Sequence, residues 1–235
     1  VARRRHYREL HLFARFEAPN TEVLAELLHI GVPMGVTLLM EAGLFVAVAL
    51  ALGTLGTDVV ASHQVAINFA SVTFMVPLGL AMATTVRVGH AVGRGDAHGV
   101  REAGLVGIGL TLGAQTISAG LMLGLPQQIA SLYTDDAGVI ALATQLLVLA
   151  GLFQFSDGLQ VAANGALRGL KDTRMPMLIT MFAYWGVGMP VGWWLAFRHG
   201  LGARGMWMGL IAGLSVAALL LTRRFWKLAR IPAQT

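Results

Sequence analysis

Six long apolar runs constrain this chain more than any other feature of its sequence. In each run an extended stretch passes with hardly one ionisable side chain, and a helix needs about 20 such residues to cross the hydrocarbon core of a bilayer. The runs are continuous rather than alternating at every second residue, which disfavours a membrane β-barrel. The sequence therefore predicts an all-α membrane protein with six transmembrane helices. With short connections between them, the predicted spans are residues 24–52, 59–87, 101–125, 138–167, 175–197 and 204–225.

The composition excludes several other classes of protein. Hydrophobic residues make up 56% of the 235 residues and charged residues only 12%, a balance that a water-soluble domain of this size could hardly hide in one core. The chain has no cysteine, and therefore neither a disulfide framework nor a thiolate metal site. It carries no HExxH, GxSxG or glycine-rich phosphate motif, so no enzyme is predicted. The Lys and Arg residues lie between apolar spans rather than on one amphipathic face, which argues against a nucleic-acid partner.

The positive charges fall on one side of the predicted spans. Of the 17 Lys and Arg residues, 15 lie in the N-terminal segment, the second and fourth connections or the C-terminal tail, or at the span ends that border them, and only Arg198 and Arg204 lie on the other side. Because cytoplasmic loops carry the excess of Lys and Arg, both termini are expected in the cytoplasm. The predicted organisation is a basic cytoplasmic segment (residues 1–22), a six-helix membrane unit (23–226) and a cytoplasmic tail (227–235). We also expect the coding sequence to begin upstream of Val1.

Two carboxylates fall well inside predicted spans. They are Glu41 in the segment TLLMEAGLFVAV and Asp157 in the segment GLFQFSDGLQVAANG. An acid near the middle of a span costs about 2.5–3.5 kcal/mol unless it faces a cavity, a cation or a proton. No Lys or Arg falls well inside a predicted span to pair with either acid. We therefore predict that Glu41 and Asp157 form the site of a coupling cation.

Polar side chains near these acids recur at helical spacing. The stripes are Thr37, Glu41 and Phe45; Gln64 and Asn68; and Phe153, Asp157, Gln160 and Asn164. Residues three or four apart share one face of a helix, so three helices are expected to meet at one polar chamber. Carboxylate and amide oxygens suit a hard cation such as Na⁺, whereas a carboxylate in a low-dielectric site can instead hold a proton at neutral pH. Gln160, Asn164 and Asn68 are candidates to support the bound cation; the alternative is that they only hydrogen-bond helices together.

Two further features allow both a structural and a functional interpretation. Asp135 and Asp136 in the segment LYTDDAG precede the fourth span, where an Asp can cap a helix or attract cations to an outward mouth. His63 is next to Gln64 in the second span. It can relay protons, although a packed, neutral histidine is the preferred interpretation.

Five segments along the predicted spans carry a resemblance to a known family. In order, they are GVPMGVTLLMEAGLFVAVAL, ASHQVAINFASVTFMVPLGLAMATTVRVGHAVGRGD, SLYTDD, FSDGLQVAANGALRGLKDTRMP and AYWGVGMPVGWWLA. Together they resemble the second half of a NorM-type transporter of the MATE (multidrug and toxic compound extrusion) family. The resemblance is collinear and runs from about residue 25 to residue 226.

This resemblance implies an antiporter of twelve helices in two six-helix lobes. Such a protein exports drugs and organic cations in exchange for Na⁺ or H⁺ and needs no prosthetic cofactor. The chain would be the C-terminal lobe, with membrane lipid and a missing N-terminal six-helix lobe as its partners. Residues 1–22 would link the lobes, and the protein would lie in the cytoplasmic (inner) membrane of a bacterium.

The resemblance also assigns roles to individual residues. Glu41 and Asp157 match the cation-binding acids of the family. The positions that match the drug path are Phe45, Gln64 and Asp136, with Asp135 beside them. Relatives often have Tyr where Phe153 stands, so this chain has one fewer candidate hydroxyl ligand for the cation.

Two other functions stay open from the sequence. A lipid or lipid-linked oligosaccharide flippase of related architecture would need a more basic chamber to handle pyrophosphate, whereas the predicted interior is acidic. A non-transporting membrane fragment would keep the six helices without coupled flux.

Overall fold

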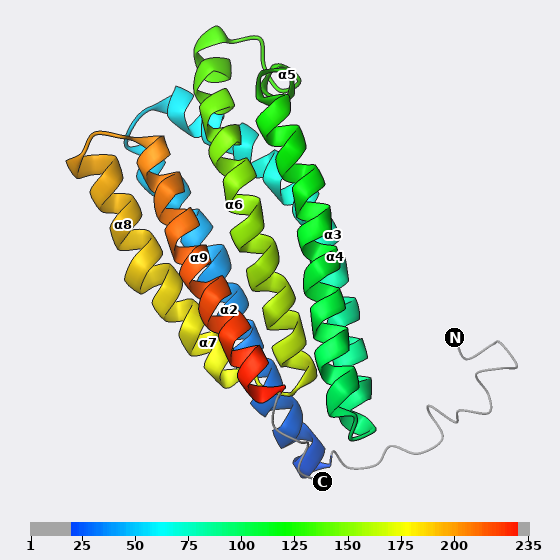
Figure 1. Cartoon of the computed structure of the whole chain (residues 1–235). Coiled ribbons are helices and arrows are strands. Elements are labelled where there is room, and N and C mark those ends of the chain that lie inside the picture. The colour runs from blue at the N-terminus through cyan, green and yellow to red at the C-terminus, as the bar shows by residue number, and fades with distance from the viewer. Residues whose placement is uncertain (1–19, 230–235) are drawn as a thin grey trace, which may run out of the picture.

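The computed structural model describes residues 20–229, and this part of the chain is almost entirely helical, with no strand (Figure 1). Two short π-helical segments, η1 and η2, interrupt the fifth span. In chain order, the elements are α2 (Thr21–Gly53), α3 (Thr57–Gly93), α4 (Ala97–Gly124), α5 (Pro126–Ser131), α6 (Ala137–Gly169), α7 (Arg174–Met181), η1 (Phe182–Gly188), α8 (Met189–Trp193), η2 (Trp194–Arg198) and α9 (Ala203–Leu228).

Six helical segments of the described residues are long and apolar enough to cross a membrane. They are Thr21–Gly53, Thr57–Gly93, Ala97–Gly124, Ala137–Gly169, Arg174–Arg198 and Gly202–Leu228. Each matches one predicted span, which confirms the prediction of an all-α membrane protein with six transmembrane helices. The third prediction ran one residue too far, to Leu125, because Pro126 disfavours helical backbone at the residue before it. Residues 1–19 and 230–235, which make up most of the two predicted cytoplasmic segments (1–22 and 227–235), lie outside the described residues.

Three helices begin at a polar side chain that caps their first free N–H groups. Asn20 Oδ1 accepts hydrogen bonds from the backbone of α2, and Asp96 Oδ1 accepts from Gly99 N over 2.8 Å at the start of α4. Asp136 does the same for α6. These caps define where each span leaves its connection.

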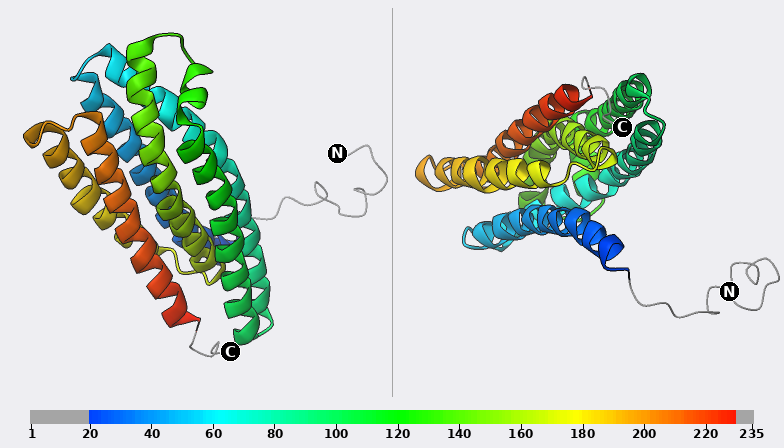
Figure 2. Two further views of the ribbon diagram at one scale, coloured as in Figure 1. Left: turned by 45° about the horizontal axis from the view of Figure 1, so that its top comes forward. Right: turned by 90° about the horizontal axis from the view of Figure 1, so that it is seen from below.

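Helix α6 is the centre of the bundle. It packs against α3, α4, α5 and α9 (Figure 2), and every residue from Gln160 to Leu167 is buried. At Gly165 an added methyl group would stand 2.6 Å from the carbonyl oxygen of Ala81. The backbones of α3 and α6 therefore touch directly, as small residues permit between helices in lipid.

The fifth span is not a uniform α-helix, although its apolar pattern predicted one helix. Pro190 follows η1 and has no N–H to donate to the preceding turn, and the chain passes through π-helical hydrogen bonding on both sides of α8. Gly192 faces Gly209 of α9 at backbone contact. Within η1 the side chain of Tyr184 is fully buried, so this irregular span points a polar group into the bundle.

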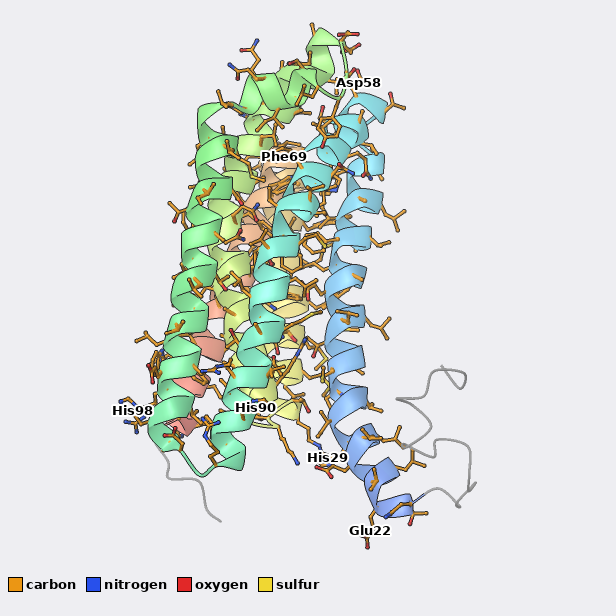
Figure 3. All side chains as sticks on the ribbon, turned by 90° about the vertical axis from the view of Figure 1, so that its right-hand side faces the viewer. Glu22, His29, Asp58, Phe69, His90 and His98 are labelled. Carbon is orange, nitrogen blue, oxygen red and sulfur yellow. The ribbon has the colours of Figure 1, made fainter. Side chains whose placement is uncertain are left out.

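The connections rich in Lys and Arg lie at one end of the bundle, called the basic end below. The start of α2, the α3–α4 turn, the α6–α7 turn and the end of α9 share this end (Figure 1). Glu22 and His90 mark it in Figure 3, where Asp58 marks the opposite end. Arg198 and Arg204 flank the η2–α9 connection at the opposite end. The charge asymmetry of the sequence is therefore an asymmetry of the bundle.

Two ion pairs join elements at the basic end. Lys171 Nζ lies 2.5 Å from Glu26 Oε1, which links the α6–α7 turn to α2. Arg224 Nε lies 2.5 Å from Asp172 Oδ2, which links α9 to the same turn. The second pair is much less exposed than the first, so it is the stronger structural contact of the two.

Candidate functional site

The two intramembrane acids line one cavity between α2, α3 and α6. Asp157 is only 4% exposed, and Glu41 is half-buried. The cavity has a volume of about 190 Å³. Its lining consists of Glu41, Phe45, Ile67, Ala70, Ser71, Phe74, Phe153 and Asp157. The structure thus brings Glu41 and Phe45 of α2 together with Asp157 of α6, which the sequence placed on two separate helices.

Helical spacing sets the geometry of this cavity. Phe45 lies one turn after Glu41 on α2, and Phe153 lies one turn before Asp157 on α6. The two phenyl rings meet edge to face, with centroids 6.2 Å apart. Thr37, predicted on the same stripe, instead donates its hydroxyl to the carbonyl of Pro33 over 2.9 Å. That bond is internal to α2, so the Thr37 hydroxyl bonds the helix backbone next to Pro33 rather than the cavity.

Neither carboxylate has a partner of its own among the described residues. Four ion pairs are found between residues 20 and 229, and none includes Glu41 or Asp157. No side-chain hydrogen bond of this part of the chain reaches either acid. Two acids held in a partly apolar cavity without such partners favour the binding of something positive.

Arg168 is nearer to this site than the sequence predicted. The fourth predicted span ended at residue 167, but α6 continues to Gly169, and the partly buried guanidinium of Arg168 interacts electrostatically with Glu41. Its Nε has no hydrogen-bond partner within the described residues. The sequence predicted no Lys or Arg well inside a span, and Arg168 lies in the last turn of α6. The helix extends past the end of the apolar run, so this guanidinium belongs to α6 rather than to the connection after it.

Gln160 and Tyr184 form a buried polar pair beside the acids. Gln160 lies next to the hydroxyl of Tyr184, and both Glu41 and Asp157 act electrostatically on that hydroxyl. Gln160 Oε1 and Tyr184 OH are buried, and neither atom has a hydrogen-bond partner among the described residues. Buried oxygens without partners are uncommon, so these two atoms are candidate ligands. Oxygen ligands of this type suit Na⁺ or a proton-carrying water.

Sequence reasoning missed Tyr184 as a site residue. Aromatic residues of a span are usually packing or interfacial groups, so their presence in the fifth span did not single it out. One signal was present: of the three tyrosines, only Tyr184 falls inside a predicted span. A phenol far from both ends of a span needs a hydrogen-bond partner.

The remaining amides of α6 have different surroundings. Asn164 is buried, two turns from Asp157 toward the basic end. Gln154 Nε2 donates to the hydroxyl of Thr73 on α3. Gln115 Nε2 on α4 donates to Gln154 O over 2.9 Å and to Gln154 Oε1 over 3.1 Å. Gln154 therefore ties three helices together.

Gln64 and Asn68 lie apart from the acids. They line a second cavity of about 440 Å³ near the α5–α6 connection, together with Tyr133 and Thr134. Tyr133 OH donates to Asn68 Oδ1 over 3.0 Å. The sequence predicted one polar chamber, but the structure has two cavities. A spacing of four residues places Gln64 and Asn68 on one face of α3, but it does not determine which neighbouring helix or connection that face contacts.

Asp135 and Asp136 are both exposed in the α5–α6 connection, beside this second cavity. Asp136 Oδ1 accepts from Gly138 N over 2.8 Å and from Val139 N over 2.9 Å. Asp136 is therefore the N-cap of α6, as the structural interpretation predicted. Both bonds go to one carboxylate oxygen of Asp136.

His63 belongs to an aromatic row that ends at the acidic cavity. Trp207 Nε1 donates to His63 Nδ1 over 3.2 Å, and the two rings meet edge to face. Trp207 in turn contacts Phe153, with centroids 5.8 Å apart, and Phe153 contacts Phe45. His63 is 1% exposed, which agrees with the preferred interpretation as a packed histidine.

Comparisons with known proteins identify the family of the chain. A family model described as MatE matches residues 33–194. The chain is 52% identical over 228 residues to the probable multidrug resistance protein NorM of Xanthomonas axonopodis pv. citri, covering 97% of this chain and 50% of that protein. It is 47% identical over 228 residues to the multidrug resistance protein PmpM of Pseudomonas aeruginosa, covering 95% and 48%. The chain spans about half the length of the curated relatives it matches.

Solved structures share the fold. The outward-facing conformation of a multidrug resistance MATE family transporter of the MOP superfamily superposes with a TM-score of 0.84 at 21% identity, covering 92% of this chain and 48% of that chain. The eukaryotic MATE transporter AtDTX14 superposes with a TM-score of 0.80 at 23% identity, covering 91% and 49%. The curated relatives are named multidrug resistance proteins, in agreement with the prediction that the chain is not an enzyme. The family model and the half-identical relatives together show that this chain belongs to the MATE family.

Proposed function

We propose that this chain is the C-terminal lobe of a cation-coupled antiporter that exports drugs or organic cations. The chain spans half the length of its relatives, which supports the lobe assignment. Those relatives are named multidrug resistance proteins, which supports the export of drugs. The other half would be an N-terminal six-helix lobe. The basic end would face the cytoplasm of a bacterium, with the bundle in the inner membrane.

The observation that carries the proposal is the cavity shared by Glu41 and Asp157. Na⁺ or H⁺ would bind between these acids, with Gln160 and Tyr184 as neutral oxygen ligands on its buried side. Asn164 would support this site from the next turns of α6. When the cation leaves, two unneutralised acids cost about 5–7 kcal/mol in the membrane interior. A second conformation, in which the acids meet water or a cationic drug, lowers this cost. The coupling cation and the drug therefore shift the same equilibrium between two conformations of the transporter.

The substrate path would use both cavities. Phe45 would present an aromatic face to an organic cation beside Glu41, an arrangement that attracts cations electrostatically. Gln64, Asn68 and the exposed Asp135 and Asp136 would line the route at the opposite end. The flippase alternative requires a basic chamber, whereas both ionisable residues that line the cavity of Glu41 are acids.

A flux assay on the full-length transporter tests the cation site. Glu41→Gln and Asp157→Asn should each reduce coupled drug efflux from proteoliposomes by about tenfold or more, because a contact to a charged group is worth about 1.5–3 kcal/mol. Asp58→Asn is the matched control, since Asp58 is an exposed acid at the opposite end of the bundle. Coupled efflux that is unimpaired in both site variants would refute the assignment.

The same assay identifies the coupling ion. Drug efflux is measured once with an imposed Na⁺ gradient at equal pH and once with a pH gradient in Na⁺-free medium. Stimulation by only the first gradient assigns Na⁺, and stimulation by only the second assigns H⁺. Efflux that responds to neither gradient would contradict coupling through these acids.

A further inference from the structure

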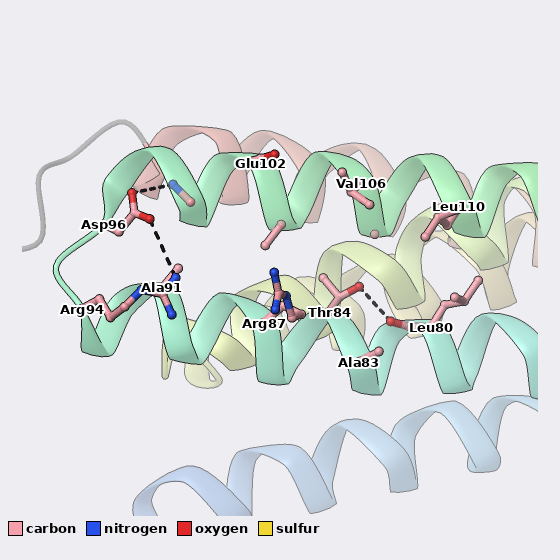
Figure 4. A pocket seen from close by; sticks show the side chains of 13 residues that line it. Leu80, Ala83, Thr84, Arg87, Ala91, Arg94, Asp96, Glu102, Val106 and Leu110 are labelled. Carbon is pink, nitrogen blue, oxygen red and sulfur yellow. Dashed lines mark hydrogen bonds and ion pairs between the residues drawn. The ribbon is translucent and has the colours of Figure 1, made fainter.

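A second charged cleft lies between α3 and α4 at the basic end, away from the acids discussed above. Its volume is about 260 Å³, and it shares no lining residue with the cavity of Glu41 and Asp157. Figure 4 shows the side chain of Arg87 pointing from α3 toward α4. Glu102 lines the same cleft from α4. Arg94 and Asp96 also line it, so the cleft presents charged groups of both signs.

The charges of this cleft differ in how far they are already engaged. Arg94 Nη2 lies 3.8 Å from Asp96 Oδ2, and the other oxygen of Asp96 caps α4. Asp96 is thus occupied, while Arg94 keeps further donors. Arg87 takes part in none of the ion pairs or side-chain hydrogen bonds found in residues 20–229. In the described part of the chain, the one ion pair of Glu102 is with the exposed His98, at 3.9 Å.

The walls of the cleft become apolar toward the middle of the span. Leu80 and Ala83 of α3 and Val106 and Leu110 of α4 continue the lining beyond the charged groups. Val106 and Leu110 are 52% and 57% exposed. Leu80 precedes Arg87 by seven residues, about 10 Å along a helix. An amphipathic ligand with a charged head and an apolar tail fits this gradient.

We propose that this cleft binds a phospholipid with a primary-amine headgroup. Arg87 and Arg94 hold the phosphate, since guanidinium groups match phosphate oxygens by charge and geometry. Glu102 accepts hydrogen bonds from the ammonium group, and one acyl chain lies along Leu80, Val106 and Leu110. A purely anionic headgroup would leave Glu102 facing negative charge. Basic pockets between transmembrane helices are known sites for lipid headgroups.

Native mass spectrometry of the full-length protein tests the proposal. The protein is equilibrated in nanodiscs of phosphatidylethanolamine, phosphatidylglycerol or phosphatidylcholine, and the lipids retained after release are counted. Retention should be highest for phosphatidylethanolamine. Arg87→Gln should lower its retention about tenfold, as expected for a lost charged contact. Arg223→Gln, an exposed basic residue at the same end but outside the cleft, should leave retention unchanged.

The Glu102→Gln variant tests whether the cleft recognises the ammonium group of the lipid headgroup. It should weaken retention of phosphatidylethanolamine and leave that of phosphatidylglycerol equal or higher. This variant also decides the matter if Arg87→Gln fails to fold. Added glycerophosphoethanolamine should not displace the bound lipid, because it lacks the acyl chain; displacement would instead assign a soluble phosphate ligand. Equal retention of all three lipids, or equal loss in Arg87→Gln and Arg223→Gln, would overturn the proposal.

Discussion

Trp207 on α9 donates a hydrogen bond from Nε1 to Nδ1 of His63 on α3 over 3.2 Å, and both side chains are almost fully buried. An accepting Nδ1 carries no proton, so the tautomer with hydrogen on Nε2 is the one that fits. The bond joins the first half of the bundle to its last helix through a polar contact in an apolar setting.

His63→Phe should therefore lower the free energy of unfolding by about 1 kcal/mol, because the indole N–H of Trp207 would stay buried without an acceptor. Thermal unfolding in detergent measures the change. The double variant with Trp207→Phe should recover part of the loss, since both polar groups are then gone. If the two single changes simply add, the hydrogen bond contributes nothing to stability. Coupled efflux that vanishes in a stably folded His63→Phe protein would instead favour the relay interpretation.

Gly165→Ala should be much more disruptive than its size suggests. The new methyl group would meet the backbone of Ala81, which cannot move aside as a flexible side chain can. Overpacking of this kind costs about 1–3 kcal/mol. Gly113→Ala on α4 is the matched control, since nothing lies within 4 Å of its added carbon, and it should leave the melting temperature unchanged or slightly higher. Similar melting temperatures for the two variants would show that α3 and α6 can separate without cost.

The spans and the acids were predictable because each rests on a large, local energy. An apolar run of span length is stable chiefly as a transmembrane helix, and an acid within it has a large free-energy cost however the helix packs. Glu41 and Asp157 could thus be selected without knowing their neighbours. Their meeting in one cavity agrees with the helical faces on which the sequence placed them.

The surroundings of Gln64, Asn68 and Tyr184 could not be predicted, because they depend on how each helix is rotated against its neighbours. Gln64 and Asn68 share a face of α3, as their spacing indicates, but that face meets the α5–α6 connection rather than Asp157. Tyr184 enters the site from a π-helical segment, and no hydrophobic period predicts π-helical hydrogen bonding. Helix rotation is set by packing over the whole bundle, which a single sequence does not report.

Arg224→Gln should destabilise the bundle more than Glu26→Gln. The Arg224–Asp172 pair has side chains that are 28% and 15% exposed, whereas the Lys171–Glu26 pair is 69% and 57% exposed. Loss of the first should cost about 1–3 kcal/mol, because a partly buried carboxylate is left unpaired. Loss of the second should cost less than about 1 kcal/mol. Thermal unfolding at low and high salt checks both values, and equal effects would contradict a structural role for Arg224.

Tyr184→Phe tests whether the buried hydroxyl takes part in the proposed cation site. The change removes one oxygen and keeps the ring that fills the core, so the fold should hold. A neutral ligand to a charged group is worth about 1.5–3 kcal/mol, and the coupling-ion concentration that half-saturates drug efflux should rise about tenfold. Tyr133→Phe is the control, since its hydroxyl bonds Asn68 beside the other cavity.

Phe153→Tyr is the complementary change. Its ring lines the cavity one turn before Asp157, so a hydroxyl there would add an oxygen ligand to the proposed cation site. It should lower the half-saturating ion concentration, and it should restore much of the affinity lost in Tyr184→Phe because the two hydroxyls reach the same acids. If Tyr184→Phe and Tyr133→Phe have equal effects, the hydroxyl of Tyr184 does not bind the ion. If Phe153→Tyr rescues nothing while both proteins stay folded, the ion binds away from the wall formed by α6.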